Sequence, residues 1–250
     1  MKKRALLIGL GMLATQPFAT AAMAGDQWSS QCDIPEAVIT KIQSQLKTVV
    51  NLPDHNGGIF APNRMWSAIV DRKGQFCSII SIGDAWPGSR AIAIAKAETA
   101  NDFSNDGLSL STANLYAPTQ PGGSLYGLNN SNPFNPDYLA QNSLSPNYHI
   151  ASNSDNWGGG NGPKVPGGII TFGGGVALYV GGKVIGGLGV SGDSSCADHA
   201  IAYRMRKAAG FDKIPSGVGP GGTDNILYAA AGTTPTGFQH PHCFPQDITP

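Results

Sequence analysis

The sequence predicts an α+β fold: one antiparallel β-sheet flanked by helices, with a long irregular insertion. Two observations support this fold class. Two stretches have the pattern of a β-hairpin, and a helix pattern follows each of them. Because a hairpin pairs its strands antiparallel, a single sheet is the simplest assembly of the expected order helix, hairpin, helix, long loop, hairpin, helix.

The clearest hairpin has β-forming runs at 173–180 and 183–190, separated by a Gly-Gly pair. Glycine readily adopts the positive φ of a tight hairpin turn, so this pair predicts the turn. The other hairpin has strands at 66–70 and 75–82 around a short polar turn.

Three segments have the apolar spacing or the alanine content of helices, and each is preceded by residues typical of a helix start. They are 35–50 with Pro35 in the first turn and Asp33 as cap, 90–100 with Ser89 as cap, and 197–209 with Ser195 and Asp198 as a capping box.

The insertion, residues 107–166, is rich in Asn, Pro, Gly and Ser, yet it contains scattered aromatic residues that a disordered linker would lack. We therefore interpret it as an ordered, irregular excursion of one domain, residues 25–250, which ends in a Gly- and Pro-rich tail at 214–250.

Residues 1–24 have the features of a secretory signal peptide: a basic start, a short apolar run, and small residues at Ala22 and Ala24. A membrane anchor would need roughly 20 apolar residues, which is more than this run provides. The sequence therefore predicts a soluble protein that is periplasmic or secreted.

Charge argues against two classes of partner. Sixteen Lys and Arg balance sixteen Asp and Glu, and only 13% of residues are charged. A neutral chain of this kind lacks the basic surface that binds nucleic acid or anionic membranes. No later segment is apolar enough for membrane insertion.

The four cysteines, all after the predicted leader, indicate two disulfides in an oxidising compartment. Three pairings exist. Cys32–Cys77 with Cys196–Cys243 closes the shorter loops and is favoured on that ground alone. A cysteine-based metal site is the alternative, although the chain has no C-x-x-C spacing.

Several pieces of the sequence, in order and spacing, resemble the HbpS/GlcG family of haem-binding proteins. They are 68–74, 85–90 with 93–100, and 166–168 with 173–192. The resemblance implies a profilin-like domain of antiparallel sheet plus helices, self-association and haem binding. The long excursion and the cysteines depart from the compact members and look like a secreted, disulfide-bearing branch.

Haem iron accepts His, Met, Cys or Tyr as ligand, and His199 is the leading candidate. It lies off the apolar stripe of the last helix, with Tyr203 one turn later on the same side. A solvent-facing or capping histidine is the alternative. Arg90, Lys183 and Arg204 are candidates for the haem propionates, without ranking.

The other histidines have simpler structural interpretations. His55 lies in a predicted turn, and His149 lies in the excursion, where it could act only if that loop folds over a pocket. His240 and His242 precede Cys243, and this grouping allows a metal cluster, although a structural turn beside a disulfide is favoured.

Two further motifs have structural explanations. Residues 187–192 match G-x-G-x-x-G, but a hairpin precedes them instead of a βαβ unit, so glycines that allow close backbone approach are the better reading. Residues 192–195, Gly-Asp-Ser-Ser, resemble the surroundings of some nucleophilic serines, but helix capping explains them without catalysis.

The leading hypothesis is an exported haem-binding homo-oligomer that stores, transports or senses haem or binds another flat, apolar molecule. The alternative is a periplasmic small-molecule enzyme, or an enzyme accessory protein, with a pocket under the excursion. Asp198 and His199 beside Asp102 would then be the clustered acid–base groups. A purely structural or partner-binding oligomer is the third hypothesis.

Overall fold

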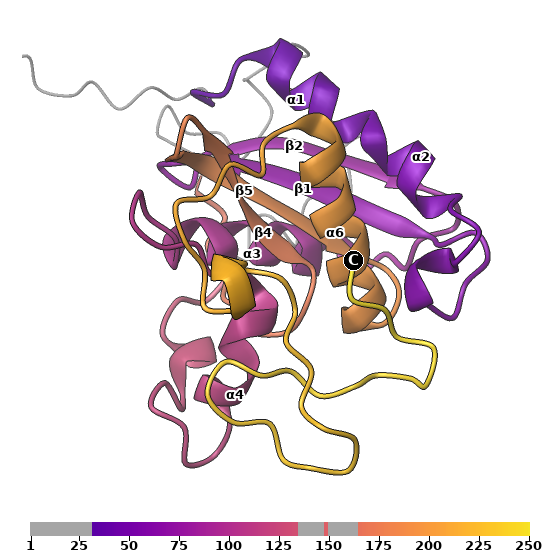
Figure 1. Cartoon of the computed structure of the whole chain (residues 1–250). Helices are drawn as coiled ribbons and strands as arrows, with labels where there is room; N and C mark the ends of the chain where they lie inside the picture. Colours follow the sequence, from indigo (N-terminus) through magenta and orange to yellow (C-terminus); the bar gives the residue numbers. More distant parts are fainter. Residues whose placement is uncertain (1–31, 135–147, 150–164) are drawn as a thin grey trace, which may run out of the picture.

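A computed structural model describes residues 32–134, 148–149 and 165–250. The predicted signal peptide and much of the excursion, including Trp157, lie outside these residues. The described chain confirms the predicted fold class, because one antiparallel sheet is flanked by helices on both faces (Figure 1).

Within the described residues the sheet has five strands in the order β3-β2-β1-β5-β4, and all neighbours run antiparallel. Both predicted hairpins are confirmed, β1 with β2 and β4 with β5. Gly181 and Gly182 form the second turn with φ values of 57° and 78°. The strands are β1 Met65–Asp71, β2 Phe76–Ile82, β3 Tyr148–His149, β4 Gly175–Val180 and β5 Lys183–Ser191.

The longer helices cover opposite faces of the sheet. In Figure 1, α6 lies in front of the sheet with α1 and α2, and α3 lies behind it. Short helices occupy the loops between them. The α-helices are α1 Glu36–Gln43, α2 Gln45–Val50, α3 Ser89–Asp102, α4 Tyr116–Thr119 and α6 Ser195–Ala209; the 3-10 helices are η1 His55–Gly57, η2 Thr112–Leu115, η3 Leu128–Asn130 and η5 Pro220–Gly222.

Strand β1 alternates its side chains between two hydrophobic cores. Ala68 and Val70 pack under α3, whereas Met65 and Ile69 pack under α1, α2 and α6. This period of two is the pattern of a strand buried on both faces. The sheet is therefore the middle layer of a three-layer domain.

Glycines on β5 let α3 approach the sheet closely. A Cβ at Gly187 would lie 2.0 Å from the carbonyl oxygen of Ala97, and one at Gly189 would lie 2.0 Å from that of Ala93. Both contacts are far inside van der Waals distance. Close packing of α3 therefore explains the first two glycines of the G-x-G-x-x-G pattern, and the third, Gly192, lies equally close to the backbone of Arg64, where a Cβ would be 2.0 Å from the carbonyl oxygen. Close backbone approach, the interpretation favoured from the sequence, thus accounts for all three.

We expect Gly189→Ala to lower the free energy of unfolding by about 2 kcal/mol, because α3 must move away from β5. Urea denaturation measures this change. Gly88→Ala is the matched control, since a Cβ at Gly88 meets no atom within 4 Å. Equal stability of the two variants would contradict this account of the packing.

Helix boundaries differ from the predictions in four places, the last of them at Ser89. The helix expected at 35–50 divides at Ser44, whose hydroxyl donates back to the carbonyl of Lys41 at 2.9 Å, competing with the helical pattern. Asp33 caps no helix; its carboxylate pairs with Lys73 at 2.8 Å. Ser194, not Ser195, caps α6 by accepting from the amide of Ala197.

Ser89 likewise is not a cap but the first residue of α3, where Gly88 holds the N-cap position without a side-chain bond. The predicted cysteine pairing is confirmed. The Cα atoms are 5.2 Å apart in Cys32–Cys77 and 6.0 Å apart in Cys196–Cys243.

The tail is fastened to the domain by a buried ion pair. Both guanidinium NH groups of Arg206 donate to the carboxylate of Asp224 at 2.6 Å, and Ser109 donates to the same carboxylate. The described part of the excursion, 107–134, also bonds to the tail, since the Asn114 amide donates to the carbonyl of Asn225. Among the described residues, no helix is long and apolar enough to cross a bilayer.

Candidate functional site

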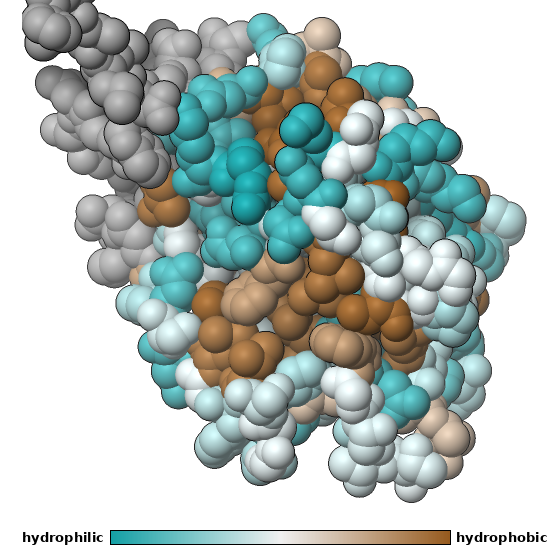
Figure 2. Space-filling view, turned by 60° about the vertical axis from the view of Figure 1, so that its left-hand side comes forward, coloured by the Kyte–Doolittle hydropathy of each residue, from teal (hydrophilic) through white to brown (hydrophobic). Residues whose placement is uncertain are grey.

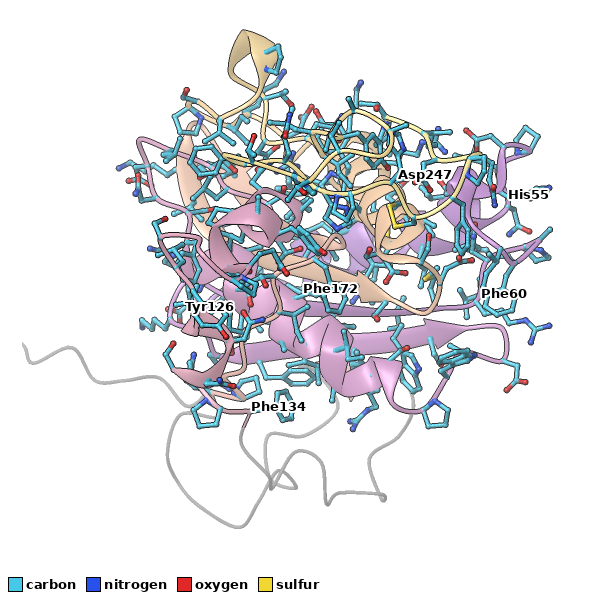
Figure 3. All side chains as sticks on the ribbon, turned by 90° about the horizontal axis from the view of Figure 1, so that it is seen from below. His55, Phe60, Tyr126, Phe134, Phe172 and Asp247 are labelled. Carbon is cyan, nitrogen blue, oxygen red and sulfur yellow. A yellow bond between two sulfur atoms is a disulfide. The ribbon has the colours of Figure 1, made fainter. Side chains whose placement is uncertain are left out.

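The first turn of α6 lies where α3, the start of β4 and the tail meet, and it contains a buried ion pair. The ammonium of Lys96, from α3, donates to Asp198 of α6 at 2.7 Å and to the carbonyl of Val190 at 3.1 Å. Neither side chain is more than 3% exposed. Phe172 covers the ammonium, with its ring centre 4.8 Å from Nζ (Figure 3).

Glycine makes this pair possible, because the two partners come from helices on opposite faces of the sheet. Lys96 passes the start of β4, where a Cβ at Gly174 would lie 2.7 Å from Nζ. Gly174 also has a φ of 125°, which other residues rarely adopt. The polar centre therefore requires glycine at position 174, directly before β4.

Burial dominates the electrostatics of the pair. It raises the pKa of Asp198 to about 6, although Lys96 opposes the shift, and it lowers the pKa of Lys96. Both shifts have the same cause, since each charge has lost its water. The pair links α3 to α6, and the charge of each partner depends on the other.

His199 is fully buried beside this pair. Its Nε2 lies 3.0 Å from Asn225 Oδ1 and 3.0 Å from the amide nitrogen of Ile226. Its Nδ1 has no hydrogen-bond partner among the described residues. Burial lowers the pKa of His199 to about 3, so the imidazole is neutral at physiological pH.

The tautomer of His199 decides what Nδ1 can do. If Nε2 carries the proton, it donates to Asn225 Oδ1, and Nδ1 has a free lone pair. The amide of Ile226 then still has an acceptor, because it lies 2.8 Å from the same Oδ1. In the other tautomer Nε2 accepts from the amide of Ile226 at 3.0 Å, but a buried Nδ1–H is left without an acceptor, which is costly. The geometry therefore favours an unprotonated Nδ1, the form that ligates a metal.

Tyr203 lies one turn after His199, as the sequence predicted, and their rings stack with centres 5.9 Å apart. Its hydroxyl lies 3.3 Å from that of Thr223 in the tail. The side-chain amide of Asn225, which also lies in the tail, donates to the carbonyl of Pro250 at 2.8 Å. Tail residues thus cover the face of α6 that carries His199.

His240 is the second buried histidine of this region. Its Nε2 accepts from the amide of Gly173 at 3.3 Å, and its Nδ1 lies 2.7 Å from the carbonyl of Pro241. Burial lowers its pKa to about 4. Ser195 Oγ lies 3.5 Å from Nε2, but a carbonyl rather than a carboxylate orients the ring, and a base this weak does not form the triad of a serine hydrolase.

The predicted propionate partners do not converge on His199. Arg90 is half-buried in the first turn of α3, and exposed Lys183 pairs with Asp106 beyond the other end of that helix. A helix of 14 residues separates them by roughly 20 Å. Arg204 forms an ion pair with Asp54 at 2.6 Å.

The acid–base cluster of the alternative hypothesis is not formed either. Asp198 pairs with Lys96, and His199 bonds to Asn225 instead. Asp102 lies at the end of α3, where it raises the pKa of neighbouring Glu98, although burial of Glu98 is the larger cause. The three groups therefore have separate partners.

A hollow of about 660 Å³ lies where the excursion meets the tail. Segments 117–125 and 234–238 line it, and Phe238, 41% exposed, is its largest apolar side chain. Its described lining residues include no acidic or basic side chain and no histidine, cysteine, methionine or tyrosine. The hollow can hold an apolar molecule but offers neither an iron ligand nor a general acid or base.

Hydrophobic side chains also gather on one face of the surface, as Figure 2 shows. Trp86 is the most exposed tryptophan described, at 64%, whereas Trp66 and Tyr179 are buried in different cores. Trp66, Trp86 and Tyr179 therefore do not line one shared pocket that could hold a flat ligand.

Sequence reasoning missed Lys96 and Asn225. Lys96 lies in the middle of an alanine-rich helix, where a lysine normally faces water, and Asn225 lies in an irregular tail. The only signal for Lys96 was one basic residue among small ones on a helix expected to lie close to a sheet. Nothing in the sequence pairs Asn225 with His199.

Comparison with known proteins gives a family match and several structural neighbours. A family model described as "Haem degrading protein HbpS-like" matches residues 61–206, and no curated protein matches. The crystal structure of Klebsiella pneumoniae protein ORFY is 22% identical, covers 71% of this chain and 90% of its own, and has a TM-score of 0.47.

Two further solved structures are also similar, again at low sequence identity. That of the PduOC:heme complex is 24% identical, covering 70% of this chain and 94% of its own, with a TM-score of 0.47. That of a double mutant of Streptomyces reticuli HbpS is 17% identical, covering 82% and 97%, with a TM-score of 0.38. Since the family model matches more than half of the sequence, the chain belongs to the HbpS-like family.

Proposed function

We propose that this protein binds haem, with His199 as the iron ligand. Family membership supports haem as the class of ligand, because the family is described as haem-degrading. The observation that carries the choice of residue is the unpartnered Nδ1 of His199. A neutral imidazole with a free lone pair has the donor chemistry that haem iron requires.

The surroundings of His199 fit an apolar ligand in part. Ile226 and Ala113 form a small hydrophobic cluster beside it, and Tyr203 offers a flat ring. Asn225 fixes the tautomer from Nε2, as outer partners of ligating histidines do. The haem itself would supply the iron and its chemistry, and these residues would orient and shield it.

In the described state the tail covers His199, so haem can reach it only after the tail around Asn225 and Ile226 moves. The tail contains little regular secondary structure. Isolated β-bridges, the Cys196–Cys243 disulfide and the Arg206–Asp224 ion pair are among the contacts that attach it to the rest of the chain. We propose the seam between excursion and tail, which contains the hollow, as the opening. The apolar part of its lining, including Phe238, would favour the macrocycle there.

The wider proposal is an exported protein that stores, transports or senses haem as a homo-oligomer. The signal-peptide pattern at 1–24 and the two disulfides support export of a single domain at 25–250. Exposed Trp86 supports a contact between copies, because large exposed aromatic residues are typical of interfaces.

Titration of the mature protein with haemin tests the ligand. We expect a saturable shift of the Soret band near one haem per chain, and no saturable shift would remove haem as the ligand. His199→Gln should change the spectrum of the complex, because the iron loses its nitrogen ligand. His242→Gln is the matched control on an exposed ring. An unchanged spectrum in His199→Gln would reassign the ligand while leaving haem binding in place.

A further inference from the structure

The two disulfides have similar burial but different electrostatic surroundings. Each joins one buried cysteine, Cys77 or Cys196, to one half-buried cysteine, Cys32 or Cys243. Within the described residues, the two disulfides are therefore similarly exposed to a reagent. A difference in their reactivity would then reflect the groups that surround the sulfurs.

Oxygen acceptors predominate around the sulfurs of Cys32–Cys77, although the backbone amide of Ile34 also lies 3.3 Å from the sulfur of Cys32. The carboxylate of Asp71 lies within 4.8 Å of both sulfurs, and the carbonyl of Gln75 is 3.3 Å from the sulfur of Cys77. A negative charge on either sulfur would be repelled by these oxygens. Reduction passes through thiolates, so these surroundings oppose it.

Donors predominate around the sulfurs of Cys196–Cys243, although the carbonyl of Pro241 also lies 3.7 Å from the sulfur of Cys196. The backbone amide of Cys196 and the hydroxyl of Ser195 each lie 3.2 Å from the sulfur of Cys243. His240 Nδ1 lies 4.0 Å from the sulfur of Cys196. Both sulfurs also lie at the N-terminus of α6, a helix of 15 residues whose dipole favours negative charge there.

We propose that Cys196–Cys243 is a redox-active disulfide that exchanges with a dithiol reductant, whereas Cys32–Cys77 is structural. This inference does not depend on haem binding. It assigns the site a substrate class, thiols, and it uses Ser195 and His240 in a role other than hydrolysis.

The exchange takes two steps that balance. One thiolate of the reductant attacks the accessible sulfur of Cys243, the S–S bond breaks, and its electron pair leaves on Cys196, near His240. The second thiolate of the reductant then attacks its own sulfur in the mixed disulfide and releases Cys243 as a thiolate. The amide of Cys196 and the hydroxyl of Ser195 stabilise that thiolate, two protons complete the dithiol, and the reductant leaves as a disulfide.

Timed alkylation of the native, mature protein tests this assignment. Samples in dithiothreitol are trapped with N-ethylmaleimide, and peptide mass spectrometry gives the rate for each cysteine. We expect Cys196 and Cys243 to be labelled at least about tenfold faster than Cys32 and Cys77, a factor that one unit of thiol pKa can supply. Equal rates, or faster labelling of Cys32 and Cys77, would overturn the proposal.

Two controls separate chemistry from unfolding. In guanidinium chloride the two disulfides should be reduced at equal rates, since the fold no longer distinguishes them. Ser195→Ala should slow native reduction of Cys196–Cys243 about threefold by removing one donor, whereas exposed Ser131→Ala should not. An unchanged rate in Ser195→Ala would contradict the role of the donors.

Discussion

Lys96→Met should lower the free energy of unfolding at pH 8 by about 3 kcal/mol, the cost of leaving one member of a buried ion pair uncompensated. The methionine keeps most of the side-chain volume, so the loss comes from Asp198, which stays buried without its cation. At pH 5 the loss should be smaller, because the unpaired carboxyl can become protonated. Urea denaturation at the two pH values measures both effects.

The double variant Lys96→Met/Asp198→Asn identifies the cause. An amide needs no counter-charge and can still accept from the amide of Asp193, which now donates to Asp198 at 3.0 Å. We therefore expect it to be more stable than Lys96→Met alone. Lys183→Met, in an exposed pair, should leave stability unchanged. A double variant as unstable as the single one would show that packing, rather than charge, is responsible.

Acidification from pH 7 to 5 should destabilise the protein through its two buried histidines. Their pKa values in the folded state, about 3 for His199 and about 4 for His240, lie below the ordinary value of 6.5. Below pH 6.5 the unfolded chain therefore binds protons that the folded chain does not. At pH 5, each histidine should lower the free energy of unfolding by about 2 kcal/mol relative to pH 7.

Buried acids act in the opposite direction. Burial raises the pKa values of Asp198 and Glu98, so the folded chain holds protons that the unfolded chain releases, and acidification stabilises it through these groups. Comparison with His240→Gln isolates one histidine. This variant should be less stable than the parent protein at pH 7 but should lose less stability between pH 7 and 5. Parallel pH profiles for the two proteins would contradict the buried, neutral state of His240.

Local pattern was a good guide to the elements. The Gly-Gly pair at 181–182 takes the positive φ values of the predicted turn, and Ile201 and Met205 of the apolar spacing in the last helix pack in the core between α6 and the sheet, whereas Ala208 at the end of that spacing is exposed. Exact helix starts were less predictable. Neighbouring Ser194 and Ser195 are chemically equal as caps, and only the path of the chain into α6 selects the first.

The candidate site was predictable in part. His199 and Tyr203 do lie on one side of α6, as their spacing implies. The covering of these two side chains by the tail could not be predicted, because the tail joins α6 through hydrogen bonds that leave no recognisable pattern in the sequence. Arg90 and Lys183 were plausible anion partners by residue type, but their positions at opposite ends of α3 follow from chain topology alone.

The sequence by itself determined the antiparallel α+β fold, the order of its elements, the favoured cysteine pairing and the family. Periodicity, glycine turns and motif order can be recognised along the chain without knowledge of contacts between distant residues. Only the tertiary structure decided that Lys96 meets Asp198, that His199 keeps a free Nδ1, and that one disulfide lies beside the carboxylate of Asp71 and the other at the N-terminus of α6. These are contacts between segments that lie up to about a hundred residues apart. Their energies depend on burial, which a linear pattern does not specify.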